Sequence, residues 1–112
     1  MDWKIKIAQE FQAAFDARAI KNEGKARVCA RRAAGVAIRE YLSRQGIEPP
    51  RSKSAYELLK FLDEMDETPA DIRQATVYLR LRVTEEFRLP VDVDLIAEAQ
   101  KLCAALLPEW HE

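Results

Sequence analysis

Apolar side chains recur every three or four residues through most of the chain, which is the periodicity of amphipathic helices. The first run covers about 20 residues and carries an aromatic stripe. A second run, from about Lys25 to Arg44, is rich in alanine, so a neighbouring helix could approach it closely. We expect this second helix to be central, and Asn22-Glu23-Gly24 to separate it from the first. The apolar positions of the first run are Trp3, Ile7, Phe11, Ala14 and Phe15, and the three aromatic residues among them form the stripe.

Turn and capping residues mark the ends of the next elements. Gly46 stands where a left-handed C-cap is favoured, so the second helix is expected to end there. Ser54-Ala55-Tyr56-Glu57 has the spacing of a capping box and predicts the start of a short third helix. Thr68 followed by Pro69 predicts the N-cap and the first position of a fourth helix.

The remaining pattern predicts one long helix and one final helix. An apolar seam of about four turns runs from Ile72 to Phe87, and the helix should end before Leu89-Pro90. Either Asp92 or Asp94 can cap a fifth helix.

Length and composition favour the same all-α fold. The 112 residues suit a single domain, and three Gly are too few for the turns of a many-stranded β domain. A composition that is 48% hydrophobic and 33% charged supports a packed core under an ionic surface. We therefore predict that residues 1–112 form one compact bundle of about five helices, an up-and-down four-helix core with an extra short helix.

Several classes of function lose support from the residues that their chemistry needs. One His, His111, and two distant cysteines are too few for a His/Cys zinc site, and His111 stands too near the end of the sequence to serve a nucleophile. Cys29 and Cys103 fall in helical apolar runs and are expected to be reduced core residues. The isolated glycines form no phosphate loop. No metal or other cofactor is therefore expected.

The first residues lack the apolar run of a secretory signal, and no window has the length of apolar residues that a membrane span needs. We therefore expect a cytoplasmic protein with no membrane partner.

Two acidic clusters are expected to be solvated surface. Asp63-Glu64-Met65-Asp66-Glu67 spans a predicted helix end, where consecutive acids point in different directions. Glu85-Glu86 follows Arg82, and the spacing from Arg82 to Glu86 suits an ion pair on a helix surface.

A basic cluster on the second helix is the most informative charged feature. At 100° per residue, Lys25, Arg32 and Arg39 share one face of the helix. Arg27 and Arg31 stand instead at the edge of the apolar stripe. The cations can lay their stems over the core and send the charged groups to water or a carboxylate, they can form a phosphate-binding patch for RNA or a nucleotide, or they can form a surface that binds a protein. A pI near 5.9 argues against a dedicated nucleic-acid-binding domain. The candidates for binding phosphate or a partner are Lys25, Arg27, Arg31, Arg32 and Arg39, with Arg82 from the fourth helix.

The order of elements resembles the HEPN family of helical-bundle proteins, often encoded beside minimal nucleotidyltransferases. The resemblance rests on the second-helix run 26–38, on Ser54-Ala55-Tyr56-Glu57-Leu58-Leu59 and on the long fourth helix entering Phe87-Arg88-Leu89-Pro90. Catalytic members are similar to metal-independent ribonucleases and carry an Arg followed, after four to six residues, by a His. Counting from Arg80 or Arg82, no His occurs in either window. The resemblance therefore implies a member without the nuclease motif.

The leading hypothesis is a non-catalytic, HEPN-like module that binds a partner or ligand, forms a homodimer and pairs with a nucleotidyltransferase-like protein. Dimerisation would use a second apolar face of the fourth helix, formed by Val77, Tyr78 and Leu81. The alternative is an RNA- or nucleotide-binding module that uses the Arg-rich second helix. A third hypothesis, an enzyme, would act through arginines and carboxylates such as Arg31, Arg82 and Glu86.

Charge is unevenly distributed along the chain. Residues 1–45 hold 10 basic and 5 acidic side chains, whereas residues 46–112 hold 8 and 14. In a folded bundle these halves can neutralise each other or leave opposed faces for self-association.

Overall fold

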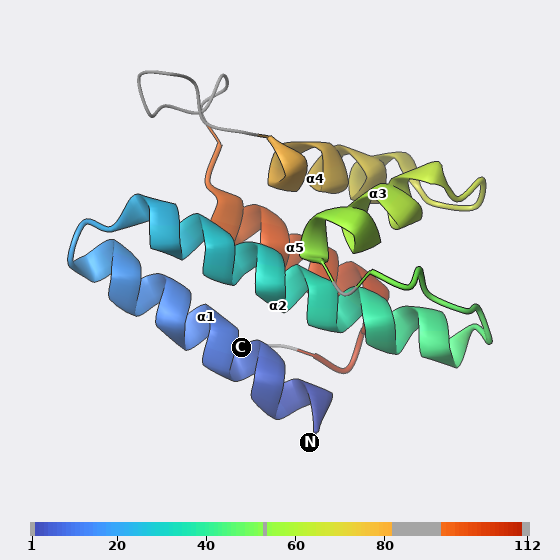
Figure 1. The fold of residues 1–112 in the computed structure, drawn as a ribbon, viewed down its shortest axis with the longest axis horizontal. Helices are drawn as coiled ribbons and strands as arrows, with labels where there is room; N and C mark the ends of the chain where they lie inside the picture. Colours follow the sequence, from blue (N-terminus) through green and yellow to red (C-terminus); the bar gives the residue numbers. More distant parts are fainter. Residues whose placement is uncertain (1, 53, 82–92, 111–112) are drawn as a thin grey trace.

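The computed structural model describes residues 2–52, 54–81 and 93–110. Within these residues the chain forms five helices and no strand, which confirms the predicted all-α class (Figure 1). The helices are α1 (Trp3–Ala19), α2 (Glu23–Arg44), α3 (Ala55–Glu64), α4 (Ala70–Arg80) and α5 (Leu95–Leu106).

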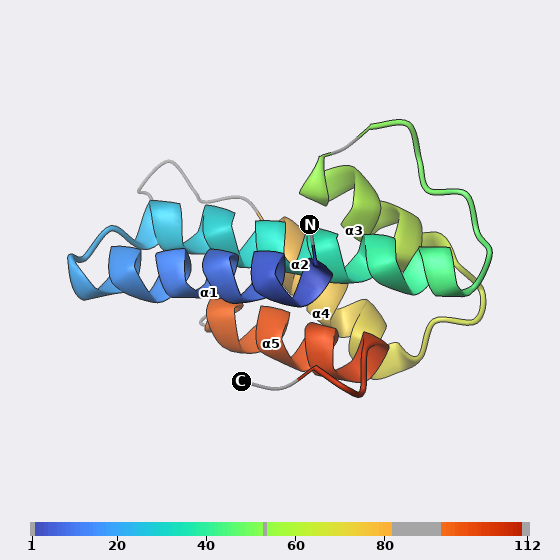
Figure 2. The same cartoon turned by 90° about the horizontal axis from the view of Figure 1, so that it is seen from below.

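Helix α2 is the central element, as its small residues predicted. It packs against α1, α3 and α5, while α4 bridges α3 and α5. Figures 1 and 2 show α1 running antiparallel to α2, and α5 running beside α2 in the same direction. Helices α1, α2, α4 and α5 alternate in direction, and the short α3 forms a hairpin with α4 (Figure 1). This is the up-and-down arrangement with an extra short helix.

The turn between α1 and α2 lies slightly earlier than the sequence suggested. Lys21 adopts the left-handed region with φ 61°, and the side chain of Asn22 accepts a hydrogen bond from the Lys25 amide at 3.2 Å. Because Asn22 caps α2, Glu23 and Gly24 belong to the first turn of that helix rather than to the break.

The end of α2 follows the prediction. Gly46 has φ 69°, and the Ile47 amide donates to the Leu42 oxygen at 2.9 Å, as in a Schellman motif.

At two predicted N-caps, the side chain does not make the expected hydrogen bond to an amide of the first helical turn. Ser54 occupies the N-cap position of α3, but its side chain makes no cap hydrogen bond. Thr68 is not the N-cap of α4, because Pro69 takes that position and the Thr68 hydroxyl donates to the Leu62 oxygen at 2.7 Å. The carbonyl at the end of α3 is therefore satisfied in preference to an amide of α4. The choice between Asp92 and Asp94 falls on Asp94, whose carboxylate accepts from two amides of the first turn of α5.

The fourth helix is shorter than predicted. It ends at Arg80, and Leu81 has the extended angles φ −60° and ψ 140°. The prediction that the helix continues to Phe87 is therefore wrong, because the helix has already ended at Leu81. The rest of the predicted apolar seam, after Leu81, lies outside the described residues. An arginine from α2 binds the carbonyls at this helix end, as described below.

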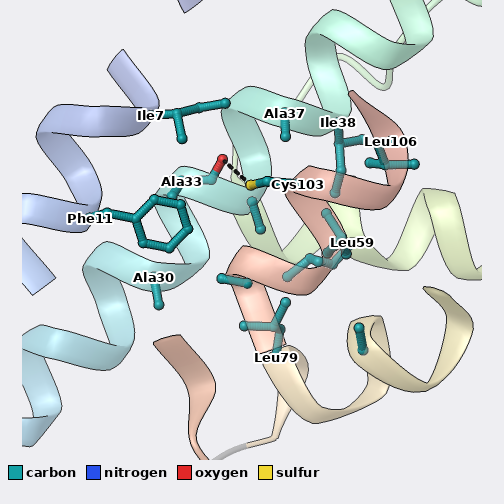
Figure 3. Packing of buried hydrophobic residues seen from close by; sticks show 14 of the residues in the cluster. Ile7, Phe11, Ala30, Ala33, Ala37, Ile38, Leu59, Leu79, Cys103 and Leu106 are labelled. Carbon is teal, nitrogen blue, oxygen red and sulfur yellow. Dashed lines mark hydrogen bonds between the residues drawn. The ribbon is translucent and has the colours of Figure 1, made fainter. Parts of the chain in front are cut away.

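The core forms where the alanine face of α2 meets the other helices (Figure 3). Phe15 departs from the predicted aromatic stripe, since it is 42% exposed. Cys29 and Cys103 are buried and free, as predicted, and the Cys103 thiol lies 3.9 Å from the Ala33 oxygen. The fully buried alanines of α2 are Ala26, Ala30, Ala33, Ala34 and Ala37.

Gly35 allows α3 to approach α2 closely. A Cβ atom at position 35 would lie 3.3 Å from the Cβ of Ala55, the first residue of α3. The absence of a side chain at Gly35 therefore sets the spacing between the two helices.

Candidate functional site

The basic residues of α2 separate onto different faces of the bundle. Arg27 and Arg31 line a pocket of about 450 Å³ between α2, α3 and the end of α4. Arg32 and Arg39 line a different hollow, beside α1 and the start of α3. Lys25 is exposed and lines neither of these sites. The candidates of α2 therefore do not form one site. Its arginines divide along the two faces that their helical angles predict, because one helix turns its side chains to several neighbours.

We call the first site the arginine pocket. Its walls combine charged, aromatic and aliphatic side chains, and most of its exposed surface is apolar. The side chains that line it are Arg27, Val28, Arg31, Tyr56, Arg80 and Leu81.

Arg31 is fixed by main-chain carbonyl groups of α4. Its Nε donates to the Leu79 oxygen at 2.6 Å, and its Nη2 donates to the Leu81 oxygen at 2.8 Å. These oxygens belong to the last turn and the C-cap of α4. Carbonyl groups at a helix end accept no hydrogen bond from the helix itself, and they carry partial negative charge. The stem of Arg31 thus follows the core edge, as one interpretation of the sequence expected, but the guanidinium binds carbonyl oxygens rather than a carboxylate.

The positive charge on Arg31 is held in an unfavourable environment. Burial lowers the pKa of the Arg31 guanidinium from its ordinary value, and the neighbouring charge of Arg27 lowers it further. Among the residues that the structure describes, neither arginine forms an ion pair with a carboxylate. An anion bound between them would offset the free-energy cost of burying this charge and the repulsion between the two guanidinium groups.

The third arginine of the pocket is already paired. The Nη2 of Arg80 lies 2.6 Å from a carboxylate oxygen of Asp63, and its Nε donates to the Thr76 oxygen at 3.3 Å. Arg73 lies on the other side of Asp63, at 4.0 Å. Asp63 is therefore not part of a solvated acidic surface, as the sequence suggested, but joins α3 to α4.

The arginine pocket has the donors that an oxyanion needs. A guanidinium has five N–H donors, and the two carbonyl contacts of Arg31 leave donors available for a ligand. Arg27 is half-buried and forms no hydrogen bond with any described residue. Two neighbouring guanidinium groups match the geometry of phosphate oxygens.

The second site is an open groove of about 240 Å³ between α1, α2 and the start of α3. We call it the basic groove. An adjoining hollow of about 200 Å³ shares Lys6, Val36 and Arg39 with it and extends to Trp3. The charged residues of the groove are Lys6, Glu10, Arg32 and Arg39, and its apolar floor includes Val36 and Leu58.

Some predicted chemistry falls on residues whose structure is not described. Arg82, Glu85, Glu86 and His111 lie in that category, so the predicted Arg82–Glu86 pair and the enzyme hypothesis built on Arg31, Arg82 and Glu86 stay predictions. Within residues 2–52, 54–81 and 93–110, no group of three His, Cys, Asp or Glu side chains could hold a metal ion. No described helix has the length and apolarity needed to cross a membrane.

Sequence reasoning missed Tyr56, Arg80 and Leu81 as pocket residues. Tyr56 was seen only as part of a capping box, and Leu81 only as part of an apolar face of α4. No local signal identifies them, because they reach Arg31 only when the hairpin of α3 and α4 packs on α2.

Comparisons with known proteins do not extend the assignment beyond the fold. Neither family models, nor curated proteins, nor solved structures gave a match to this chain. The resemblance to the HEPN family accordingly has no support beyond the residue pattern.

Proposed function

We propose that the chain is a non-catalytic helical module that binds a nucleotide or a similar phosphate ester in the arginine pocket. The observation that carries the proposal is the pair Arg27 and Arg31, which share one pocket without a carboxylate from any described residue. Two adjacent cations that lack a counter-charge favour an anionic ligand.

The size and lining of the pocket favour a small ligand over a long nucleic acid. A volume of about 450 Å³ falls in the usual range for small-molecule sites. Tyr56, Val28 and Leu81 offer an aromatic ring and aliphatic surface against which a base could lie. The pocket therefore favours the nucleotide over RNA as the ligand. It also reduces the proposed binding cations of α2 from five to two, Arg27 and Arg31.

Non-catalytic binding fits the groups that line the pocket. Guanidinium, phenol and aliphatic side chains bind and orient a phosphate ester, but none of them has an ordinary pKa near neutrality for general acid–base chemistry.

Calorimetric titration with a nucleoside monophosphate tests the proposal. Arg27→Met should weaken binding at least tenfold, because a charged hydrogen bond to phosphate is lost, while the variant breaks no hydrogen bond between Arg27 and a described residue. Lys25→Met is the matched control, because it removes a positive charge from the same helix at an exposed position outside the pocket. Equal affinities of the two variants, or no binding by the unmodified protein, would contradict the proposal.

Homodimerisation and pairing with a nucleotidyltransferase-like protein stay predictions. The apolar face expected to form the dimer is divided in the structure. Val77 is 40% exposed, Tyr78 packs partly against the core, and Leu81 lines the arginine pocket.

A further inference from the structure

The cations of the basic groove lack partners in the described part of the chain. Lys6, Arg32 and Arg39 form no ion pair there, and Glu10 lines the groove beside them. Glu40, in the adjoining hollow, is paired with Arg44 at 2.9 Å. The groove therefore has an excess of positive charge over an apolar floor.

The α2 side of this groove has a regular spacing. Arg32, Val36 and Arg39 stand at positions i, i+4 and i+7 and line the groove together. Seven residues of helix span about 10.5 Å, so the two guanidinium stems leave α2 about two turns apart with an apolar residue between them. A helix with acid, apolar and acid residues at the same spacing would complement this face.

The same chain carries such a helix face. On α3, Glu57, Phe61 and Glu64 stand at positions i, i+4 and i+7. Phe61 is only partly buried, Glu64 is exposed, and neither glutamate forms an ion pair among the described residues. Helix α3 also forms a wall of the groove through Ala55 and Leu58, so the acidic face and the basic groove belong to two helices that are neighbours in the fold.

We propose that two copies of this chain associate through these faces, with Glu57, Phe61 and Glu64 of each copy seated on Arg32, Val36 and Arg39 of the other. A two-fold axis lets each copy supply both faces, so every contact is made twice. The interface includes none of the residues that line the arginine pocket, and it differs from the face of α4 that the sequence suggested.

A single-stranded nucleic acid fits the groove less well than a second copy. Glu10 and Glu40 would repel a chain of phosphates, which has a negative charge on every nucleotide, more strongly than they repel the two separated glutamates of α3. The ring of Trp3, at the end of the adjoining hollow, already has Lys4 at 5.5 Å and Arg44 at 5.4 Å from its centroid, which competes with stacking of a base.

Charge-reversed variants, with their molecular mass measured by light scattering, test the interface. The test holds for either direction of α3 along α2 of the other copy. The unmodified protein at high micromolar concentration should have twice the 12.9 kDa mass of one chain by light scattering. The variant R32E/R39E and the variant E57R/E64R should each be monomeric, because like charges then face each other. An equimolar mixture of the two variants should restore the dimer, because one copy then supplies acids wherever the other supplies bases.

The control is K25E/R51E, which makes the same change in charge at two exposed positions outside the groove. It should stay dimeric, and circular dichroism should show unchanged helix content in every variant. A monomeric unmodified protein, a dimer that persists in both reversed variants, or a mixture that stays monomeric would overturn the proposal. Preferential binding of a single-stranded oligonucleotide that R32E/R39E abolishes, without any dimer, would overturn it in favour of nucleic acid.

Discussion

The guanidinium of Arg31 lies at the end of α4, where its Nη2 donates a hydrogen bond to the main-chain oxygen of Leu81, 50 residues later in the sequence. A second donor of the same group binds Leu79. One side chain of the central helix thereby satisfies two carbonyl groups at a helix end and forms one wall of the arginine pocket. Arg31 therefore joins α2 to the end of α4 and also lines the candidate site.

Arg31→Lys should lower the free energy of unfolding by about 1–3 kcal/mol, because an ammonium group lacks the fork that reaches two carbonyl oxygens. Urea unfolding followed by circular dichroism measures this loss. Arg51→Lys, at an exposed position outside the pocket and the groove, should change stability by less than about 0.5 kcal/mol. Equal stability of the two variants would show that the contacts of Arg31 do not hold α4.

Gly35→Leu should lower the free energy of unfolding by about 1–3 kcal/mol, because even a Cβ at this position would lie 3.3 Å from that of Ala55. The thermal midpoint should fall accordingly. Gly24→Ala is the control: its nearest neighbour, Asn22 Oδ1, would be 3.9 Å away, so stability should stay equal or rise by up to about 1 kcal/mol. A stable Gly35→Leu variant would mean that α3 shifts without cost.

Asp94 should make stability depend on pH in the acid range. Burial acts to raise the pKa of Asp94, but the hydrogen bond from the Ala97 amide, the contact with Arg18 and the Ile96 amide together outweigh burial and lower the pKa. A carboxyl group whose pKa is lower in the folded state stabilises the fold above its unfolded pKa, near 3.8, and this contribution is lost as the pH falls through the folded pKa.

Thermal unfolding between pH 2 and pH 7 tests the role of Asp94. Asp94→Asn should retain most of the cap but reduce the loss of stability below about pH 4, since the titrating charge is gone. Asp94→Ala should cost about 1 kcal/mol even at neutral pH, because the cap is also lost. An acid profile that Asp94→Asn leaves unchanged would assign the pH dependence to other carboxylates.

Cys103 should be unreactive in the folded protein. Burial raises the pKa of its thiol to about 12, so almost no thiolate is present at pH 8. In a Cys29→Ala variant, which leaves one thiol, Ellman's reagent should react only after denaturant unfolds the chain. Rapid reaction under native conditions would show that α5 opens locally at this position.

The described helices follow from local features of the sequence. Apolar spacing locates all five, and the alanines of α2 identify it as central, because small side chains there can meet helices on several sides. Gly46 and Asp94 act at helix ends as predicted, since each works on main-chain groups a few residues away. The predicted end of the fourth helix fails because Leu81 is extended and a side chain of α2 binds its carbonyl.

The candidate sites follow less directly. Six cations were singled out as one set, and helical angles alone separated Arg27 and Arg31 from Arg32 and Arg39. Their partners could not be inferred in the same way. Asp63 shows the difficulty, since a run of acids indicates a solvated surface, yet its pairing with Arg80 depends on how α3 folds against α4.

The sequence by itself determined the class of the fold, the number and order of its described helices and most of the residues that enter the core, because these depend on periodicity and on main-chain capping within a few residues. Only the tertiary structure decided that Arg27 and Arg31 share a pocket with Tyr56 and Leu81. A long charged side chain can reach any of several neighbours, and its partner is fixed by the packing of helices that are distant in the chain.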